Sequence, residues 1–353
     1  MSKKTSYRVL GVMSGTSLDG VDLAIVDFYI KKNKWKFKLL EFKTLNYSTH
    51  FKNQLSIAHN FDVNQIKKLD SEYTFILAGM INSFLEKLKI NIDFVSSHGH
   101  TVLHQPEKGI TIQIGNNIKL SNLISKKVVC DFRTQDVLFG GQGAPLVPVG
   151  DYHLFSEFDY TLNLGGFANI TNLTDQFPRA HDICAVNTVL NKLSKELNFD
   201  YDSEGKIAKS GNLIKDLKYE LDNIKFYKVK PPKSLGVEWV NKVVYPVLNK
   251  YKSSKLEDIL HTYSIHISEV LSKELPEGKK ILLSGGGSFN NFLIEKIVEK
   301  SKSEIKIPSK EIINFKEAII FAFIGVLKIR NEINCFKSVT GARKDHCSGI
   351  IYN

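Results

Sequence analysis

A polar turn between two apolar runs holds the densest group of residues that could bind a phosphate. Residues 9–13 and 21–28 are apolar and predict two strands, so the segment between them predicts a hairpin turn. Glycines in such a turn let the backbone approach an anion, and carboxylates can hold magnesium through water. An ordinary tight turn uses the same residue types, so both interpretations stay open here. The candidate residues are Gly15, Thr16, Ser17, Leu18, Asp19, Gly20, Val21 and Asp22.

Two further glycine turns could contact the same ligand. One separates two apolar runs within residues 160–173, so it repeats the strand, turn, strand pattern and predicts two similar halves. The other lies between an apolar strand and a helix, and it offers a surface against which a flat nucleoside could lie. The first turn contains Gly165 and Gly166, and the second contains Gly285, Gly286 and Gly287.

Asp182 is the candidate general base. It lies in a segment that we expect to be a loop, just before a predicted helix at 188–197 with Asn187 as its N-cap. A carboxylate at such a position can take a proton from a bound reactant. A single aspartate before a helix is also a common turn or capping residue, so this position has a structural alternative.

Three histidines, His98, His100 and His104, follow a strand predicted at 92–96, in what we expect to be a polar loop. Their spacing allows a metal site, but no acidic ligand lies close in the sequence, so hydrogen bonding to a polar ligand is favoured. Arg133 follows another predicted strand at 128–131. The carboxyl ends of strands are where α/β proteins tend to place ligand groups.

The composition limits the possible partners and locations. The net charge of +11 raises the question of nucleic acid, but the lysines are scattered and no nucleic-acid motif is present, so we expect no such partner. The longest apolar run, 318–327, is too short to span a membrane, and the N-terminus has no apolar signal core. Four cysteines without a CxxC pair indicate free thiols in a reducing cytoplasm.

The length of 353 residues predicts two domains. We expect an N-terminal domain at 1–145, completed by the C-terminal segment 337–353, and a C-terminal domain at 146–336. The glycine- and proline-rich segment 139–148 is interpreted as a hinge between them or as a turn against a ligand. Helices are expected at 65–88, 117–126, 255–275, 292–300 and 315–330, the last one buried because its apolar residues surround it.

Taken together, several blocks resemble the anhydro-N-acetylmuramic acid kinases, members of the actin-like sugar kinase superfamily. The blocks occur in family order through nearly the whole chain: GVMSGTSLDGVD, SSHGHTVLHQP, TIQIGN, CDFRTQDVLFGGQGAPLVP, LNLGGFANIT, PPKSLG, LSGGGSFN, EAIIFAF and SVTGA. The resemblance implies an α/β, two-domain actin-like (ribonuclease H-like) fold with an ATP cleft between the domains.

The resemblance also implies an activity. The expected enzyme is a cytoplasmic kinase of peptidoglycan recycling and amino-sugar catabolism that depends on ATP and Mg²⁺. It would open the 1,6-anhydro bridge of anhydro-N-acetylmuramic acid with water and phosphorylate O6, giving N-acetylmuramate 6-phosphate and ADP. A homodimer without membrane contact is the expected state.

The resemblance assigns roles to residues whose blocks match. Residues 15–22 match the segment that binds the ATP phosphates, residues 285–287 the nucleoside loop, and Asp182 the catalytic base. His98, His100 and Arg133 fall in blocks that line the sugar side. Glu317 and Asp19 are expected to position water and metal, with Mg²⁺ held through ATP and water and no side chain assigned as its direct ligand.

One block departs from the family pattern. The family loop reads Asp-Thr-Gly-Pro-Gly-Asn, whereas residues 182–187 read Asp-Ile-Cys-Ala-Val-Asn. If the family glycines need a positive φ, Ala185 and Val186 would be strained there. Three alternatives therefore stay open: another actin-fold amino-sugar kinase, a metal-dependent hydrolase built on His98 and His100, and a catalytically silent nucleotide-binding homologue.

Overall fold

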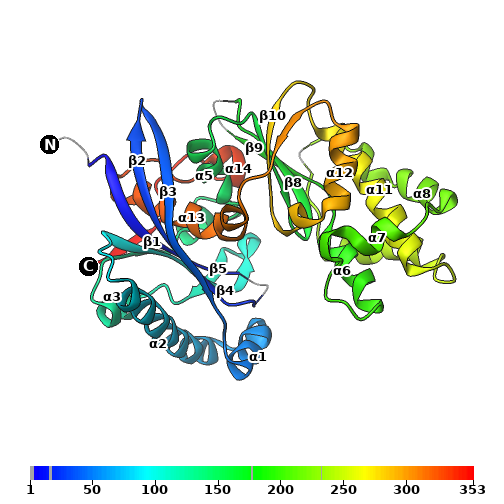
Figure 1. Ribbon diagram of the computed structural model, residues 1–353. Helices are drawn as coiled ribbons and strands as arrows, with labels where there is room; N and C mark the ends of the chain where they lie inside the picture. Colours follow the sequence, from blue (N-terminus) through cyan, green and yellow to red (C-terminus); the bar gives the residue numbers. More distant parts are fainter. Residues whose placement is uncertain (1–3, 16–17, 176–177, 232) are drawn as a thin grey trace. The chain divides into compact units, whose positions relative to one another are not determined.

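The computed structural model describes residues 4–15, 18–175, 178–231 and 233–353. The chain divides into two compact units (Figure 1). Unit 1 comprises Met1–Phe155 and Phe315–Asn353, and unit 2 comprises Ser156–Asn314. Each unit contains one β-sheet and its own hydrophobic core.

The sheet of unit 1 begins with an antiparallel meander of β1, β2 and β3, and β4 then pairs with β1 in parallel. The strand order is β12-β6-β4-β1-β2-β3, with β5 pairing with β4. The strands are β1 (Ser6–Ser14), β2 (Val21–Lys31), β3 (Lys34–Leu45), β4 (Phe94–Gln105), β5 (Ile110–Ile114), β6 (Val128–Cys130) and β12 (Ile350–Tyr352). The predicted hairpin of β1 and β2 is confirmed, with Met13 opposite Asp22.

Helices cover both faces of this sheet (Figure 1). On one face, residues of β1 such as Leu10 and Val12 share a core with α1, α2 and α3. Helix α2 has a capping box of Asp62 and Gln65, which explains why it begins there. The helices of unit 1 are α1 (Thr49–Ile57), α2 (Val63–Leu88), α3 (Ile118–Ile124), α4 (Thr134–Leu138), α5 (Val147–Leu154), α13 (Lys310–Ile329) and α14 (Lys337–Thr340).

Helix α13 packs on the other face of the same sheet, directly against β1. A Cβ on Gly11 would overlap the carbonyl oxygen of Ala318, so only glycine allows this approach. The expectation of a buried helix is confirmed, because residues 318–327 are nearly all buried. This packing also corrects the expected domain boundaries, since α13 from Phe315 onward belongs with unit 1 and the first segment of that unit runs to Phe155.

The sheet of unit 2 repeats the topology of unit 1. Its order is β11-β10-β7-β8-β9, with β7, β8 and β9 forming an antiparallel meander and β10 and β11 added in parallel. The strands are β7 (Tyr160–Leu164), β8 (Phe167–Asn172), β9 (Arg179–Ala185), β10 (Lys280–Ser284) and β11 (Glu304–Lys306). A meander followed by parallel strands on the far side of its first strand is the ribonuclease H-like arrangement, and its occurrence in both units confirms the two similar halves.

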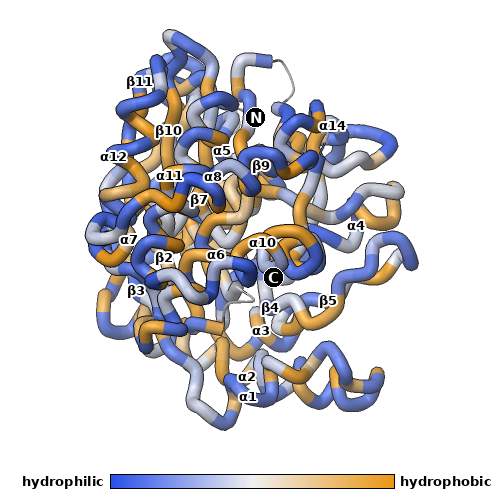
Figure 2. Tube along the Cα trace, turned by 90° about the vertical axis from the view of Figure 1, so that its right-hand side faces the viewer, coloured by the Kyte–Doolittle hydropathy of each residue, from blue (hydrophilic) through white to orange (hydrophobic). Residues whose placement is uncertain are grey.

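The core of unit 2 lies between this sheet and a group of helices. Helix α11 runs through it, with Tyr263, Ile267 and Leu271 fully buried. Along the tube, hydrophobic and hydrophilic residues alternate on such helices, as expected where one face is buried (Figure 2). The helices are α6 (Asn187–Glu196), α7 (Lys206–Ser210), α8 (Lys215–Asp222), α9 (Val237–Trp239), α10 (Tyr245–Asn249), α11 (Leu256–Glu274) and α12 (Asn291–Lys300).

Two segments expected to be loops are strands. Residues 97–105 continue β4, because their backbone pairs with β5. Asp182 lies within β9, which pairs with β8, rather than in a loop before a helix. The segment 139–148 lies inside unit 1 and is not the boundary between the units. Within the described part of the chain, no helix is long and apolar enough to cross a bilayer.

Candidate active site

In the β1–β2 turn, Gly15 and Leu18 are joined through their main chains. The Leu18 amide donates to the Gly15 carbonyl at 3.3 Å, and Leu18 itself has a φ of 59°. Asp19 is exposed, and Gly20 and Val21 are buried. Two predicted members of this site, Thr16 and Ser17, lie outside the described residues.

Asp22 stands at the start of β2, on the strand side of this turn. Its Oδ1 accepts a hydrogen bond of 2.5 Å from the Thr44 hydroxyl. Burial raises the pKa of Asp22, and the Thr44 hydrogen bond opposes that rise. The carboxyl is therefore oriented by its neighbour across the β2–β3 pair.

A buried chain of hydroxyls ends at His100. Ser14 Oγ lies 2.8 Å from His100 Nδ1 and 2.6 Å from the Tyr47 hydroxyl, which in turn lies 3.3 Å from the Tyr73 hydroxyl. Burial lowers the pKa of His100 to about 4, so the ring is neutral at pH 7. Sequence reasoning missed Tyr47 and Tyr73, because only the fold brings α2 and the β3–α1 connection to the end of β1.

His98 and Arg133 form a second buried pair. Arg133 Nε donates to His98 Nε2 at 2.9 Å, and His98 Nδ1 lies 2.8 Å from the Gly99 carbonyl oxygen. Burial, with the charge of Arg133, holds the pKa of His98 well below its usual value. Both ring nitrogens are thus occupied by protein groups, which leaves no lone pair for the metal site considered above. Arg133 also donates to the Gly143 carbonyl at 2.5 Å.

Glu317 is positioned by the contact between α13 and β1, because it immediately precedes Ala318. Part of its side chain is exposed to solvent. Neighbouring protein groups nevertheless desolvate the carboxyl, which raises the pKa of Glu317, while the charges of Arg133 and Lys316 oppose the rise. The charge of Asp22 also acts on Glu317. In unit 1, Glu317 therefore interacts electrostatically with both Asp22 and Arg133.

In unit 2, Asp182 is held by main-chain groups of residues 233–235. The Leu235 amide donates to Asp182 Oδ2 at 2.8 Å, and the Asp182 amide donates to the Lys233 carbonyl at 3.1 Å. Burial raises the pKa of Asp182, while the Leu235 hydrogen bond lowers it. None of Cys184, Ala185 and Val186 has a positive φ, so the strain considered for this departure from the family loop is absent.

A charged network that sequence reasoning missed lies beside Asp182. Lys233 Nζ, with a side chain 3% exposed, pairs with Glu274 Oε1 at 3.0 Å, and Glu274 Oε2 lies 3.4 Å from His181 Nε2. The hydrogen bonds with His181 and Lys233 lower the pKa of Glu274 to about 2 although burial opposes them, so the carboxylate is ionised. The block PPKSLG contains Lys233, but nothing in the sequence indicates Glu274 as its partner.

The glycine turns of unit 2 meet at the start of α6. Asn187 is the first residue of α6 rather than its cap, and its Nδ2 donates to the Leu164 carbonyl at 3.2 Å. The Thr188 amide donates to the Gly166 carbonyl at 3.2 Å, so the turn of Gly165 and Gly166 abuts the helix N-terminus. Gly285 has a φ of 83° and lies against Leu164, a conformation that favours glycine.

An open cavity of about 490 Å³ lies at this point. It is lined by Gly166, Asn187, Thr188, Asn191, Lys192 and Lys195. Amides at a helix N-terminus and two lysines give the cavity a positive character that suits an anion.

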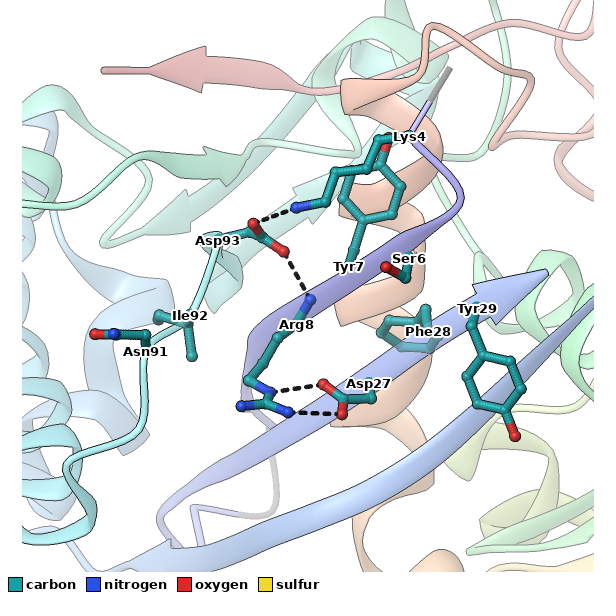
Figure 3. Close-up of a pocket in the computed structure, with 10 residues that line it drawn as sticks. All are labelled: Lys4, Ser6, Tyr7, Arg8, Asp27, Phe28, Tyr29, Asn91, Ile92 and Asp93. Carbon is teal, nitrogen blue, oxygen red and sulfur yellow. Dashed lines mark hydrogen bonds and ion pairs between the residues drawn. The ribbon is translucent and has the colours of Figure 1, made fainter. Parts of the chain in front are cut away.

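A second cavity, of about 360 Å³, lies in unit 1 between β1, β2 and the segment before β4 (Figure 3). Its charges neutralise one another, because Arg8 pairs with Asp27 through two hydrogen bonds of 2.7 and 2.9 Å and Lys4 pairs with Asp93. None of the residues predicted for the active site lines it. We therefore place the candidate active site at the two clusters described above.

The family model for anhydro-N-acetylmuramic acid kinase matches residues 7–353. The chain belongs to this family. A relative from Francisella tularensis subsp. novicida, named anhydro-N-acetylmuramic acid kinase, is 31% identical over 95% of this chain and 95% of its own length. One of the same name from Hydrogenovibrio crunogenus is 30% identical over the full length of both chains.

Membership of the family makes the chain a kinase with the predicted two-unit actin-like fold, in agreement with the repeated strand order. Among solved structures, the activator of the 2-hydroxyisocaproyl-CoA dehydratase from Clostridium difficile with bound ADPNP covers 92% of this chain and 97% of its own. Its identity is 13% and its TM-score 0.44, and nothing about this chain rests on that likeness.

Proposed function

We propose that this kinase opens the 1,6-anhydro bridge of anhydro-N-acetylmuramic acid with water and phosphorylates O6 with ATP. The products are N-acetylmuramate 6-phosphate and ADP, and the reaction serves peptidoglycan recycling. The observation that carries the proposal is Asp182, a carboxylate of raised pKa on β9 whose Oδ2 is held by the Leu235 amide. Asp182 aligns with the residue that the family resemblance implies to be the catalytic base. Its raised pKa also suits a group that accepts a proton.

The bonds that change define what Asp182 has to do. The oxygen of water bonds to C1 of the sugar, the bond from C1 to O6 breaks, and O6 bonds to the γ-phosphorus as ADP leaves. Asp182 takes the proton from the attacking water, and a raised pKa makes a carboxylate a stronger base for that step. The hydrogen bond from Leu235 orients the carboxylate while its other oxygen accepts the proton.

The remaining polar side chains proposed to act in the reaction lie in unit 1. Arg133, His98 and His100 are assigned to the sugar, and the buried contacts of each side chain fix its orientation before substrate binds. Since both ring nitrogens of His98 are bonded to protein groups, its neutral ring lines the sugar site without donating to the sugar. Glu317 positions water, with its pKa raised by desolvation. Asp19 and Asp22 have the carboxylate oxygens that suit a hydrated Mg²⁺, which when bound with ATP offsets charge on the transferring phosphoryl group.

The glycine turns of both units are assigned to ATP. Gly15 and residues 18–22 of the β1–β2 turn are assigned to the phosphates in unit 1, with Thr16 and Ser17 assigned by register alone. In unit 2, the turn of Gly165 and Gly166 abuts the N-terminus of α6, and Lys192 and Lys195 line the adjoining cavity. Backbone amides and lysines are the usual partners of phosphate oxygens. Gly285, Gly286 and Gly287 are assigned to the nucleoside.

The test is ADP release with Mg²⁺ and ATP on anhydro-N-acetylmuramic acid, beside N-acetylmuramic acid and N-acetylglucosamine. Activity on the anhydro sugar, with one ¹⁸O atom from labelled water in the product, supports the proposal. Activity only on a free amino sugar, without label, identifies another actin-fold kinase. ATP binding without turnover on any of the three identifies a silent homologue. Omitting Mg²⁺ tests the metal requirement.

The homodimeric state and the cytoplasmic location also belong to this proposal. They come from the family resemblance and, for the location, from the free cysteines. Light scattering at the working concentration tests the first, and fractionation of the source cells tests the second.

A further inference from the structure

Three side chains with metal-binding atoms meet in the interior of unit 1, and none of the three is among the residues assigned to the reaction. Asp136 on α4, Cys335 and His346 are 0%, 1% and 6% exposed. Their ligand atoms all lie within 4.8 Å of one another. Cys335 Sγ is 3.0 Å from Asp136 Oδ1, and His346 Nε2 is 3.6 Å from the same oxygen.

The backbone holds two of these residues directly opposite each other. Cys335 and His346 form an antiparallel bridge in which each amide donates to the other's carbonyl at 3.1 Å. Residues opposite each other in such a bridge place their side chains on the same face. The thiol and the imidazole are thus positioned by the main chain before any ligand arrives.

One ring nitrogen of His346, Nε2, points toward the Asp136 carboxylate. Nδ1 lies 3.0 Å from the Lys344 carbonyl oxygen, which only accepts, so Nδ1 carries the hydrogen. In the neutral ring Nε2 then has a lone pair, and among the described residues it has no hydrogen-bond partner. A lone pair facing the Asp136 carboxylate in a buried place offers a position for a cation between them.

The surrounding groups are those that accompany metal ligands. A histidine ligand usually donates its other nitrogen to a carbonyl, as His346 does to Lys344, and a carboxylate ligand is usually hydrogen-bonded in turn. Asp136 accepts from the Thr340 hydroxyl at 2.7 Å and from the Gly143 amide at 2.7 Å. A tetrahedral zinc ion with bonds of about 2.0–2.3 Å separates its ligand atoms by roughly 3.3–3.8 Å. The separation of 3.6 Å lies in this range, the one of 3.0 Å lies just below it, and all ligand atoms are within 4.8 Å of one another.

We propose that Asp136, Cys335 and His346 bind a zinc ion in the interior of unit 1. Zn²⁺ binds the sulfur of Cys335 as a thiolate. The proton of the thiol leaves to solvent, and no electron is transferred. The two anionic ligands and the neutral imidazole balance the charge of the ion, so the buried site is neutral. Three protein ligands leave one position for a water molecule.

The site would tie the C-terminal segment to the loop that supports Arg133. Asp136 holds the Gly143 amide, and the carbonyl of Gly143 accepts from Arg133. A metal ion at Asp136 therefore stabilises unit 1 and fixes this loop, while it takes no part in phosphoryl transfer. The expected effect of its removal is a lower melting temperature.

The full chain is produced with zinc in the medium, dialysed against metal-free buffer and measured for metal content. We expect about one zinc ion per chain in the unmodified protein. Cys335→Ser keeps the size of the side chain and a donor to Asp136. This variant and the separate variant His346→Gln should each lose at least nine-tenths of the zinc. Cys347→Ser, at a half-buried neighbouring cysteine, and His59→Asn, at an exposed histidine, should keep it.

Cobalt provides a readout that does not depend on the variants folding. After replacement of zinc by Co²⁺, the unmodified protein should show the near-ultraviolet charge-transfer band of a thiolate bound to cobalt. Absence of that band, or of bound zinc in the unmodified protein, overturns the proposal. Zinc content in Cys335→Ser equal to that of the unmodified protein also overturns it.

Discussion

The amide of Leu235 lies 2.8 Å from Oδ2 of Asp182, and this hydrogen bond joins the block PPKSLG to the proposed base. The Asp182 amide donates in return to the Lys233 carbonyl, so the two segments hold each other through main-chain groups. Main-chain contacts of this kind do not depend on the identity of the side chains. They explain how residues 183–186 can differ from the family pattern while Asp182 keeps its place.

Asp182→Asn should abolish most of the activity and leave nucleotide binding intact. The amide side chain still accepts the hydrogen bond from Leu235 but cannot take a proton from water, and general-base assistance contributes about 10²–10⁴ in rate. We expect kcat to fall by about that factor, measured as ADP release at saturating sugar. Asp200→Asn, at an exposed position, is the matched control. Turnover within twofold of normal would remove Asp182 from the role.

The acid limb of the pH profile should lie above the range of an ordinary aspartate. A base works only when deprotonated, and burial raises the pKa of Asp182, so activity is lost on acidification at a higher pH than for a group of pKa about 3.9. The measurement is kcat/KM against pH, with protein integrity followed by circular dichroism at each point. A folded enzyme that keeps full activity down to the ordinary aspartate range contradicts this assignment.

Arg133→Lys should weaken sugar binding more than it slows turnover. Lysine keeps the charge but loses the paired donors to His98 and Gly143, and a hydrogen bond from a charged group is worth about 1.5–3 kcal/mol. We therefore expect KM for the sugar to rise roughly 10- to 100-fold. Arg179→Lys, on an exposed strand residue, should change nothing. An unchanged KM with reduced kcat would instead place Arg133 on the transferring phosphoryl group.

Two glycine substitutions in unit 1 should have opposite effects on stability. Gly11→Ala forces a methyl group into the carbonyl of Ala318, and overpacking of this kind costs about 1–3 kcal/mol. Gly79→Ala, within α2, meets no atom within 4 Å and should stabilise the helix by up to about 1 kcal/mol. Thermal unfolding followed by circular dichroism compares them. Equal melting temperatures would show that α13 does not press on β1 in solution.

The periodic parts of the chain could be predicted from the sequence, and the reasons are local. The β1–β2 and β7–β8 hairpins were visible because apolar runs surround glycine turns, and α2 because its apolar residues recur at helical spacing. The strand character of His98, His100 and Asp182 was missed because polar residues interrupt the pattern, and only pairing with β5 and β8 makes those segments extended.

The parts that depend on distant residues could not be predicted. The ion pair of Lys233 with Glu274 links a loop to the end of α11, and no local pattern indicates it. The apolar residues all around α13 show that the helix is buried, but they do not say which sheet buries it. That choice, made by the approach of Gly11 to Ala318, is also why the second expected boundary, at 336, lies after the observed one at Asn314.

Because unit 1 is built from two segments that flank unit 2, its completion waits until the second segment has been synthesised. Unit 2 is continuous over Ser156–Asn314, so all of its strands leave the ribosome before the part of α13 that packs on β1 does. Until Phe315 and the residues after it emerge, the face of β1 around Gly11 has no covering helix. The nascent chain would therefore expose that apolar face while unit 2 is already folding.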